Sequence, residues 1–194
     1  MIRSVSADDL LRDAREAAGT RNVREAVRDL TLHALRGRPL TAEHIATVAR
    51  TVGEGIESSH LRPAMPVRET HRGAWAGLED AVAQALLAVE LAAREFSECH
   101  GGLEGPDRER LLEDIAALGR SLEEGWGGRH DVPFDLKARL GAAASHLRQS
   151  PDVRAGSCPS GGGGRACADF SLVASGILVG LSEPVRGRAA GVAI

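Results

Sequence analysis

The sequence predicts an all-α protein, an antiparallel bundle of about five helices over residues 6–150 followed by a Gly-rich, poorly ordered C-terminal tail. Apolar residues recur at steps of three and four through most of this range, as they do on the buried face of a helix. The chain of 194 residues has three Phe, two Trp and no Tyr, so Leu, Val, Ile and Ala must form most of its core. This composition favours packed helices over an aromatic-rich β sandwich.

Helical periodicity begins at Ser6, where a hydroxyl at the N-cap position is followed by two carboxylates, Asp8 and Asp9. The pattern runs to residue 36 and is interrupted at Gly19-Thr20, so this segment is one kinked helix or two. A second helix is expected to begin at Thr41 and to carry an apolar stripe as far as Ile56.

The longest periodic stretch, residues 67–100, predicts a long central helix that ends at Gly101-Gly102. Its apolar face is too wide for a two-stranded coiled coil and suits either the buried centre of a bundle or an exposed interface. The predicted interaction face consists of Trp75, Leu78, Val82, Leu86, Val89 and Phe96.

Two further helices are predicted, one from Pro106 to about residue 124 and one from about Pro133 to Ser150. Residues 151–168 are rich in glycine, serine and proline, which is typical of a flexible linker. The apolar segment 169–181 is expected to dock as a short helix or a strand, and helix is favoured. The chain thus divides into a helical domain, 1–150, and a tail, 151–194.

Charge and cysteine content limit the classes of partner and the cellular compartment that the sequence predicts. The formal net charge of -3 argues against nucleic acid as a partner, because nucleic-acid-binding domains usually have a basic excess. Three cysteines without a metal-binding spacing, and an N-terminus without an apolar signal segment, predict a cytoplasmic protein with reduced thiols. The apolar run Phe170 to Leu181 is shorter than the roughly 20 residues that span a bilayer, so no transmembrane helix is expected.

Glycines inside the predicted helices indicate close packing, since each costs about 1 kcal/mol of helix stability relative to alanine. Gly53 and Gly55 lie in one helix, and Gly73 and Gly77 in the next. One hypothesis is that these two helices cross at their glycines. The alternative is that the glycines are merely tolerated at exposed or kinked positions.

Motifs for chemistry are few. The run Gly161 to Gly164 lacks the Gly-Lys-Ser/Thr ending of a phosphate-binding loop and is interpreted as a linker. Glu57 and His60 match one Glu-x-x-His element of a di-metal bundle, but the chain has no second copy. Glu57 and His60 are therefore the only metal-ligand candidates; no cofactor and no catalytic residue is expected, which predicts a protein that is not an enzyme.

The segment GAWAGLEDAVAQALLAVELAAREF and the preceding LTAEHIATVARTVGEGIE resemble, over residues 40–124, uncharacterised bacterial helical proteins that are loosely similar to phasins. The likeness lies in Ala/Leu/Val helices interspersed with Gly. It implies a non-enzymatic interaction or surface-coating protein whose helices cover an apolar surface and associate with one another. The alternative function is a helical bundle that binds a metal ion or small ligand, with possible catalytic use.

Overall fold

The computed structural model describes residues 6–59, 67–98, 105–126, 133–149 and 164–182. Over these ranges the chain forms seven helices and no strand, which confirms the all-α prediction. The helices are α1 (Ala7–Ala17), α2 (Val23–Arg36), α3 (Ala42–Glu57), α4 (Val67–Glu98), α5 (Gly105–Trp126), α6 (Phe134–Gln149) and α7 (Gly164–Ser182). None of them is both long enough and apolar enough to cross a membrane.

The expected number of five helices over residues 6–150 is wrong, because the described part of this range forms six. The interruption at Gly19-Thr20 separates α1 from α2 rather than kinking one helix, and the Thr20 hydroxyl caps the end of α1 by donating to the Ala17 carbonyl at 2.8 Å. Beyond residue 150, the structure adds α7, which contains the apolar segment for which a helix is favoured.

Two helix starts follow from short polar side chains. The Ser6 hydroxyl accepts a hydrogen bond from the backbone N–H of Asp9 at the start of α1. At the start of α3, the Thr41 hydroxyl accepts from the backbone N–H of His44. Each cap satisfies a donor that the first helical turn leaves without an intrahelical partner.

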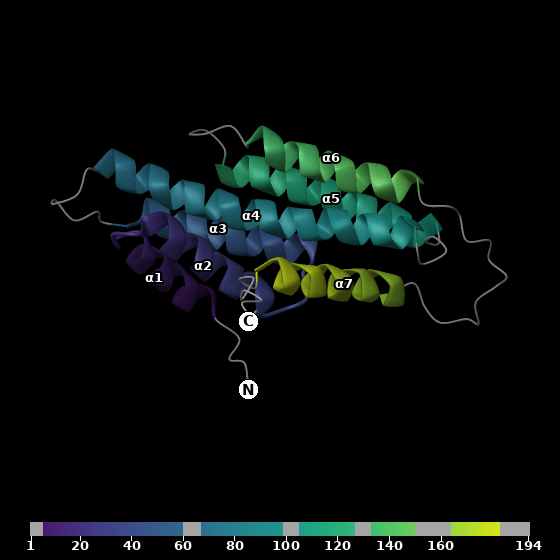
Figure 1. Ribbon diagram of the computed structural model, residues 1–194, viewed down its shortest axis with the longest axis horizontal. Coiled ribbons are helices and arrows are strands. Elements are labelled where there is room, and N and C mark those ends of the chain that lie inside the picture. Colours follow the sequence, from purple (N-terminus) through teal and green to yellow (C-terminus); the bar gives the residue numbers. More distant parts are fainter. Residues whose placement is uncertain (1–5, 60–66, 99–104, 127–132, 150–163, 183–194) are drawn as a thin grey trace, which may run out of the picture.

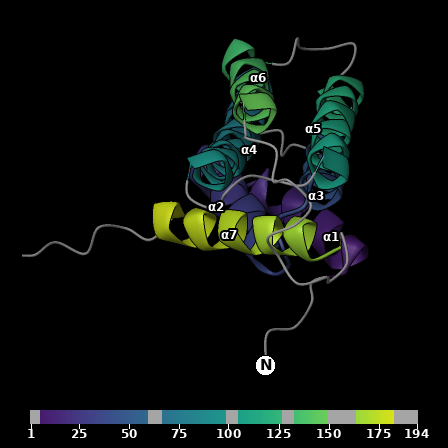
Figure 2. The same ribbon diagram turned by 90° about the vertical axis from the view of Figure 1, so that its right-hand side faces the viewer.

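The helices lie in two layers (Figure 1). Viewed from the end, α4 pairs with α6 and α3 pairs with α5, and both pairs lie over a layer made by α1, α2 and α7 (Figure 2). The long helix α4 contacts α2, α3, α6 and α7, so it is the central element of the fold.

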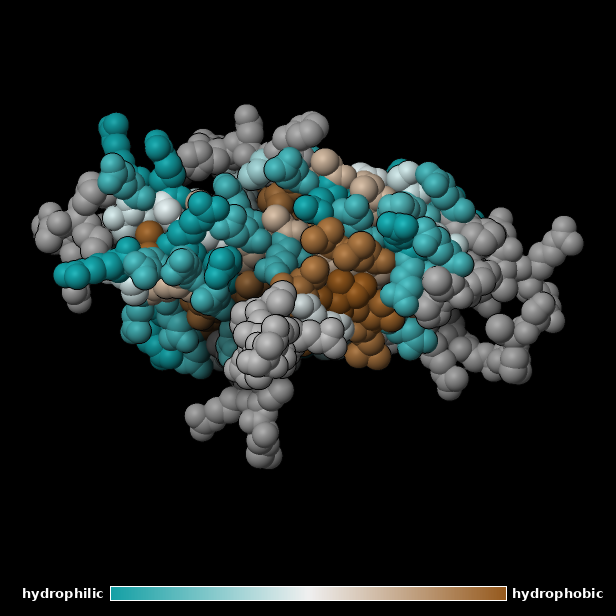
Figure 3. Space-filling view, viewed as in Figure 1, coloured by the Kyte–Doolittle hydropathy of each residue, from teal (hydrophilic) through white to brown (hydrophobic). Residues whose placement is uncertain are grey.

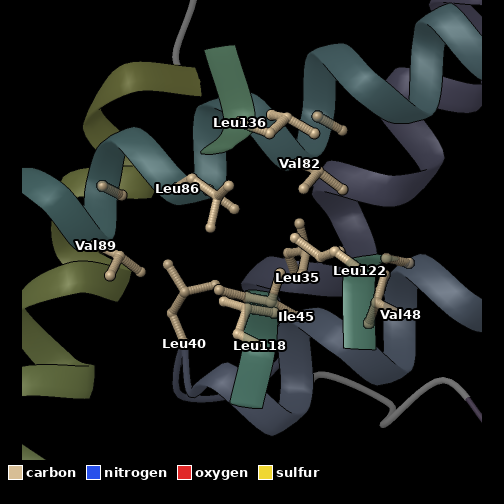
Figure 4. Close-up of a cluster of buried hydrophobic side chains, with 14 of the residues drawn as sticks. Leu35, Leu40, Ile45, Val48, Val82, Leu86, Val89, Leu118, Leu122 and Leu136 are labelled. Atoms are coloured by element: carbon tan, nitrogen blue, oxygen red, sulfur yellow. The ribbon is translucent and has the colours of Figure 1, made fainter. Parts of the chain in front are cut away.

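The core is aliphatic, as the composition predicts. The side chains labelled in Figure 4 come from five helices, α2 to α6, together with Leu40 before α3, and α7 adds the fully buried Leu178 to the core. The whole predicted interaction face of α4 belongs to this core, since every one of its side chains is at least nine-tenths buried: Trp75, Leu78, Val82, Leu86, Val89 and Phe96. This face is therefore not an exposed interface of the chain, because the neighbouring helices already cover it.

The glycines of α3 and α4 pack closely, but not mainly against each other. A Cβ on Gly55 would lie 2.5 Å from the Ala14 Cβ of α1, and a Cβ on Gly73 would lie 2.7 Å from Val23 Cγ1 of α2. A Cβ on Gly77 would collide with the backbone oxygen of Arg24 in α2. The expected close contact between α3 and α4 occurs only at Gly53, which packs against Trp75 of α4. The other three glycines allow α1 and α2 to pack closely against α3 and α4.

The prediction that the apolar segment 169–181 docks as a helix is confirmed, because it lies in α7 and α7 packs on the bundle; the expected poorly ordered tail is therefore corrected for residues 164–182. Phe170, on the inner side of α7, lies with its ring centroid 5.6 Å from that of Phe96 in α4. The backbone N–H of Leu40 donates to the Ser175 hydroxyl at 2.9 Å, and the side-chain amide of Gln84 donates to the Leu181 carbonyl at 2.8 Å. The linker prediction for 151–163 lies outside the described residues.

Candidate functional site

A cleft of about 740 Å³ runs between α3 and α5. Its walls follow helical spacing: α3 contributes one face from Ala42 to Glu57, and α5 contributes one face from Asp114 to Trp126. Several wall residues are small, which leaves the space hollow: Ala42, Ala46, Gly53, Ala117 and Gly125. This volume falls within the range of about 300 to 1,000 Å³ that is usual for small-molecule sites.

Two tryptophans meet at one end of the cleft and both line it. Trp75 comes from α4 and Trp126 from the last turn of α5, and their ring centroids are 5.8 Å apart with planes tilted by 56°. Gly53 makes room for this pair, because a Cβ there would lie only 3.2 Å from the Trp75 ring.

Both indoles leave a polar group without a partner. Trp75 is 9% exposed and Trp126 is 4% exposed, and neither Nε1–H has a hydrogen-bond acceptor among the described residues. A buried donor without an acceptor costs about 1 to 3 kcal/mol. Both Nε1 atoms are buried away from solvent, so the cleft is lined by the apolar parts of the two rings and not by their donors.

The cleft walls are strongly acidic. Five carboxylates line the cleft, against a single guanidinium, that of Arg50: Glu43, Glu54, Glu57, Asp114 and Glu124. Arg50 Nη1 lies 3.7 Å from Glu54 Oε1, and His71 Nε2 lies 3.3 Å from Glu57 Oε1 at the tryptophan end. The lining groups therefore carry an excess of negative charge.

Electrostatic repulsion acts across the cleft as well. Partial burial of the carboxyl group raises the pKa of Asp114, and the charges of Glu113 and Glu43 raise it further, while Arg110 opposes the change. Glu43 belongs to the α3 wall and Asp114 to the α5 wall. The two walls thus present like charges to each other, which is unfavourable unless a positive charge lies between them.

The family model that matches this chain covers residues 2–127, which is well over half of its length, and is described as a family of unknown function, DUF6781. The chain belongs to the DUF6781 family. No curated relative and no solved structure matches it. The comparisons give no support to the phasin-like resemblance.

The DUF6781 match takes in α1 to α5 and ends just after Trp126. Every residue that lines the cleft lies inside the matched range, whereas α6 and α7 lie beyond it. The cleft is therefore a feature that the family's own part of the chain builds.

Only Glu57 of the two metal-ligand candidates lies in the part of the chain that the structure describes. Glu57 lies at the tryptophan end of the cleft and pairs with His71 of α4, whereas His60 lies outside the described residues. No cluster of three or more His, Cys, Asp or Glu side chains suited to a metal ion occurs within the described ranges. The cleft's tryptophans and carboxylates, apart from Trp75 and Glu57, were not predicted as site residues.

A signal for the cleft was present in the sequence. Trp75 and Trp126 are the only tryptophans in the chain, and both occur at apolar positions of helical stripes. Periodicity assigns such residues to the core, and both are indeed buried. It does not show that α3 and α5 leave a space beside them, because that depends on how three separate helices pack.

Proposed function

We propose that this protein is a non-enzymatic binding protein that holds a small organic molecule in the cleft between α3 and α5. The observation that carries the proposal is a cleft of about 740 Å³ that Trp75 and Trp126 line together, between walls that contain several small side chains. Aromatic rings and small apolar side chains provide contact surface for an organic molecule, and the cleft volume suits a molecule of metabolite size. The proposal takes up the alternative function, a helical bundle that binds a metal ion or small ligand, and specifies an organic ligand.

The chain supplies its own reporter for this proposal. It has two tryptophans and no tyrosine, so its intrinsic emission comes from the cleft alone. Protein purified from its native host is denatured, and the released small molecules are identified by mass spectrometry. Adding the recovered compound to stripped protein should change the tryptophan emission in a saturable way and raise Tm. If no compound is recovered and no member of a metabolite library changes either signal, the proposal is wrong.

A second candidate function, self-association, is favoured by the outer face of α7. Leu172, Val179 and Leu181 are 59%, 43% and 38% exposed, and no residue from 170 to 182 is charged. A hydrophobic patch occupies this part of the surface in Figure 3, where Figure 1 places α7. Exposed apolar patches of this kind often mark interaction surfaces. We propose that a second copy of the chain covers this face.

Light scattering coupled to size-exclusion chromatography tests self-association. The full chain should elute as an oligomer, and Leu172→Gln with Val179→Gln should shift it to the monomer without loss of helicity. The control is Ala116→Gln, which introduces the same side chain at an exposed position of α5. A monomeric wild-type chain at high concentration would exclude this second function.

A further inference from the structure

The outer face of α7 has a regular pattern that determines how two copies of the chain can meet. This inference rests on the proposed self-association, since it describes the contact that the same face would make. Five exposed residues of α7 recur at steps of three and four, which places them on one face of the helix: Asp169, Leu172, Gly176, Val179 and Gly180. Phe170, Ala174 and Leu178, which pack on the bundle, lie on the opposite face.

The two glycines of this face leave room for another helix. A Cβ on Gly176 or Gly180 would meet nothing within 4 Å. In contrast, a Cβ on Gly55, Gly73 or Gly77 would collide with α1 or α2, so close packing within the chain explains those glycines. A glycine inside a helix lowers stability relative to alanine, and on α7 no contact within the described residues explains that cost. Two glycines four residues apart allow a second backbone to approach closely.

Opposite charges lie at the two ends of the face. At the N-terminal end, Asp169 is exposed, and its carboxylate has no ion pair or hydrogen bond among the described residues. At the C-terminal end, Arg28 and Arg36 of α2 line a cleft of about 490 Å³ beside Leu181. Arg28 is paired with Asp29 at 3.0 Å. Arg36 is exposed and has no ion-pair partner in the part of the chain that the structure describes.

An antiparallel pairing of two α7 helices brings these opposite charges together. A two-fold axis makes every contact occur twice, because each copy uses the same face. With the axis at Gly176, Asp169 of one copy lies seven residues from the crossing, about 10 Å along the helix. Ser182 of the other copy lies six residues from the crossing on the same side, next to the cleft that Arg36 lines. A parallel pairing would instead place the two Asp169 carboxylates side by side, which is unfavourable.

We propose that two copies of this chain associate through antiparallel α7 helices that cross at Gly176, with Asp169 of each copy paired with Arg36 of the other. In this register Leu172 of one copy lies opposite Gly180 of its partner, so a large side chain meets a small one at both symmetric positions. The exposed apolar surface is limited to a few side chains, which favours a weak, reversible dimer over an obligate one.

Sedimentation equilibrium of the intact chain over a range of concentrations gives the Kd of the dimer. Asp169→Arg and Arg36→Asp each place like charges at both symmetric contacts, so each should weaken the dimer about tenfold. Asp135→Arg makes the same charge change at an exposed position of α6 and should leave the Kd unchanged. The effects should shrink as salt is added, because salt screens exposed charges.

A mixture of the two single variants shows whether the charges meet between copies. In a heterodimer of Asp169→Arg with Arg36→Asp, both contacts again join opposite charges. The mixture should therefore dimerise about as tightly as wild type, although neither variant does so alone, and the variant with both substitutions should do the same. Repeating the comparison in a Glu183→Gln background removes the charge of the acidic residue that follows α7 in the sequence.

Gly176→Leu tests the close crossing. Leucine adds apolar surface to the face, so unspecific hydrophobic association would become stronger. A crossing that requires glycine should instead become about tenfold weaker, because the new side chain separates the two backbones. Gly141→Leu is the matched control, since Gly141 is exposed on α6 and a Cβ there meets nothing within 4 Å. Circular dichroism confirms that each variant keeps its helices.

The results separate this contact from self-association itself. An unchanged Kd in both charge variants, a mixture that stays monomeric, or a tighter dimer with Gly176→Leu overturns the antiparallel crossing. Self-association through α7 still stands in those cases if Leu172→Gln with Val179→Gln dissociates the wild-type oligomer. A wild-type chain that is monomeric at high concentration overturns both.

Discussion

The backbone oxygen of Arg24 in α2 lies so close to Gly77 in α4 that a single added carbon on the glycine would collide with it. The Arg24 side chain reinforces the same crossing: its Nε lies 2.7 Å from Asp80 Oδ2 and its Nη2 lies 3.0 Å from Asp80 Oδ1. The salt bridge is largely exposed and contributes little by itself. The close approach of the two backbones is what brings the layers together.

Gly77→Ala should destabilise the protein, because the new Cβ would displace α2 backbone rather than a flexible side chain. Overpacking of this kind costs about 1 to 3 kcal/mol. Gly176→Ala in α7 is the matched control, since a Cβ there meets nothing within 4 Å and alanine favours the helix by about 0.5 to 1 kcal/mol. Urea denaturation followed by circular dichroism measures both changes. Equal stability of Gly77→Ala and wild type would show that the helices do not cross closely there.

Local sequence signals predicted most of the helices because capping, periodicity and glycine are local. The caps at Ser6 and Thr41 and the core stripe from Trp75 to Phe96 required no tertiary information. Which elements cover an apolar stripe cannot be predicted from the local sequence. The wide face of α4 is consistent with both an exposed interface and a buried centre, and only the packing of α2, α3, α6 and α7 decides between them.

The segment now seen as α7 illustrates the same limit. Its apolar sequence, with no charge from 170 to 182, predicts docking and favours a helix, but it does not show where the helix docks. Whether such a segment docks depends on a complementary surface elsewhere, here the α4 surface around Phe96. The cleft could not be predicted for a related reason, because its tryptophans and carboxylates come from three helices.

Phe170→Ala should destabilise the protein by about 3 to 5 kcal/mol, because the ring is buried against Phe96. Leu172→Ala is the control on the same helix; its side chain is 59% exposed, so little stability should be lost. Thermal unfolding of the two variants gives the comparison. If α7 contributes nothing to the fold, both variants and a chain ending at Ser150 will melt at the wild-type temperature.

Replacing His44 should change how stability depends on pH. Burial lowers the pKa of His44, and the charge of Arg38 lowers it further, against the opposing hydrogen bonds to the carbonyls of Ala34 and Leu35. The unfolded chain therefore takes up a proton at higher pH than the folded chain. Stability is fully present above the ordinary histidine pKa and is lost as pH falls through the lowered one.

His44→Gln should reduce this loss, since glutamine keeps a donor for the Ala34 carbonyl and does not titrate. Chemical denaturation at intervals between about pH 8 and pH 5 measures the slope. His33→Gln, at an exposed position of α2, controls for the loss of a histidine elsewhere on the surface. An unchanged slope in His44→Gln would show that His44 is not responsible for the pH dependence.

Asp114→Asn should stabilise the empty protein near neutral pH, although Asp114 lines the cleft. Partial burial, Glu113 and Glu43 together raise the pKa of this carboxyl group over the opposing effect of Arg110, so its ionised form is less favourable in the folded chain than in the unfolded one. The ionised form therefore costs stability above the raised pKa. The cost disappears as pH falls below the ordinary carboxyl value, where the group is protonated in both states.

The Tm of Asp114→Asn should accordingly exceed that of wild type near pH 7, and the difference should vanish near pH 3. Asp135→Asn is the control, because Asp135 is exposed on α6 and does not line the cleft. The substitution removes the repulsion between Asp114 and the neighbouring charges of Glu113 and Glu43. A lower Tm for Asp114→Asn at neutral pH would mean that Asp114 is a stabilising surface charge and not a strained member of the cleft.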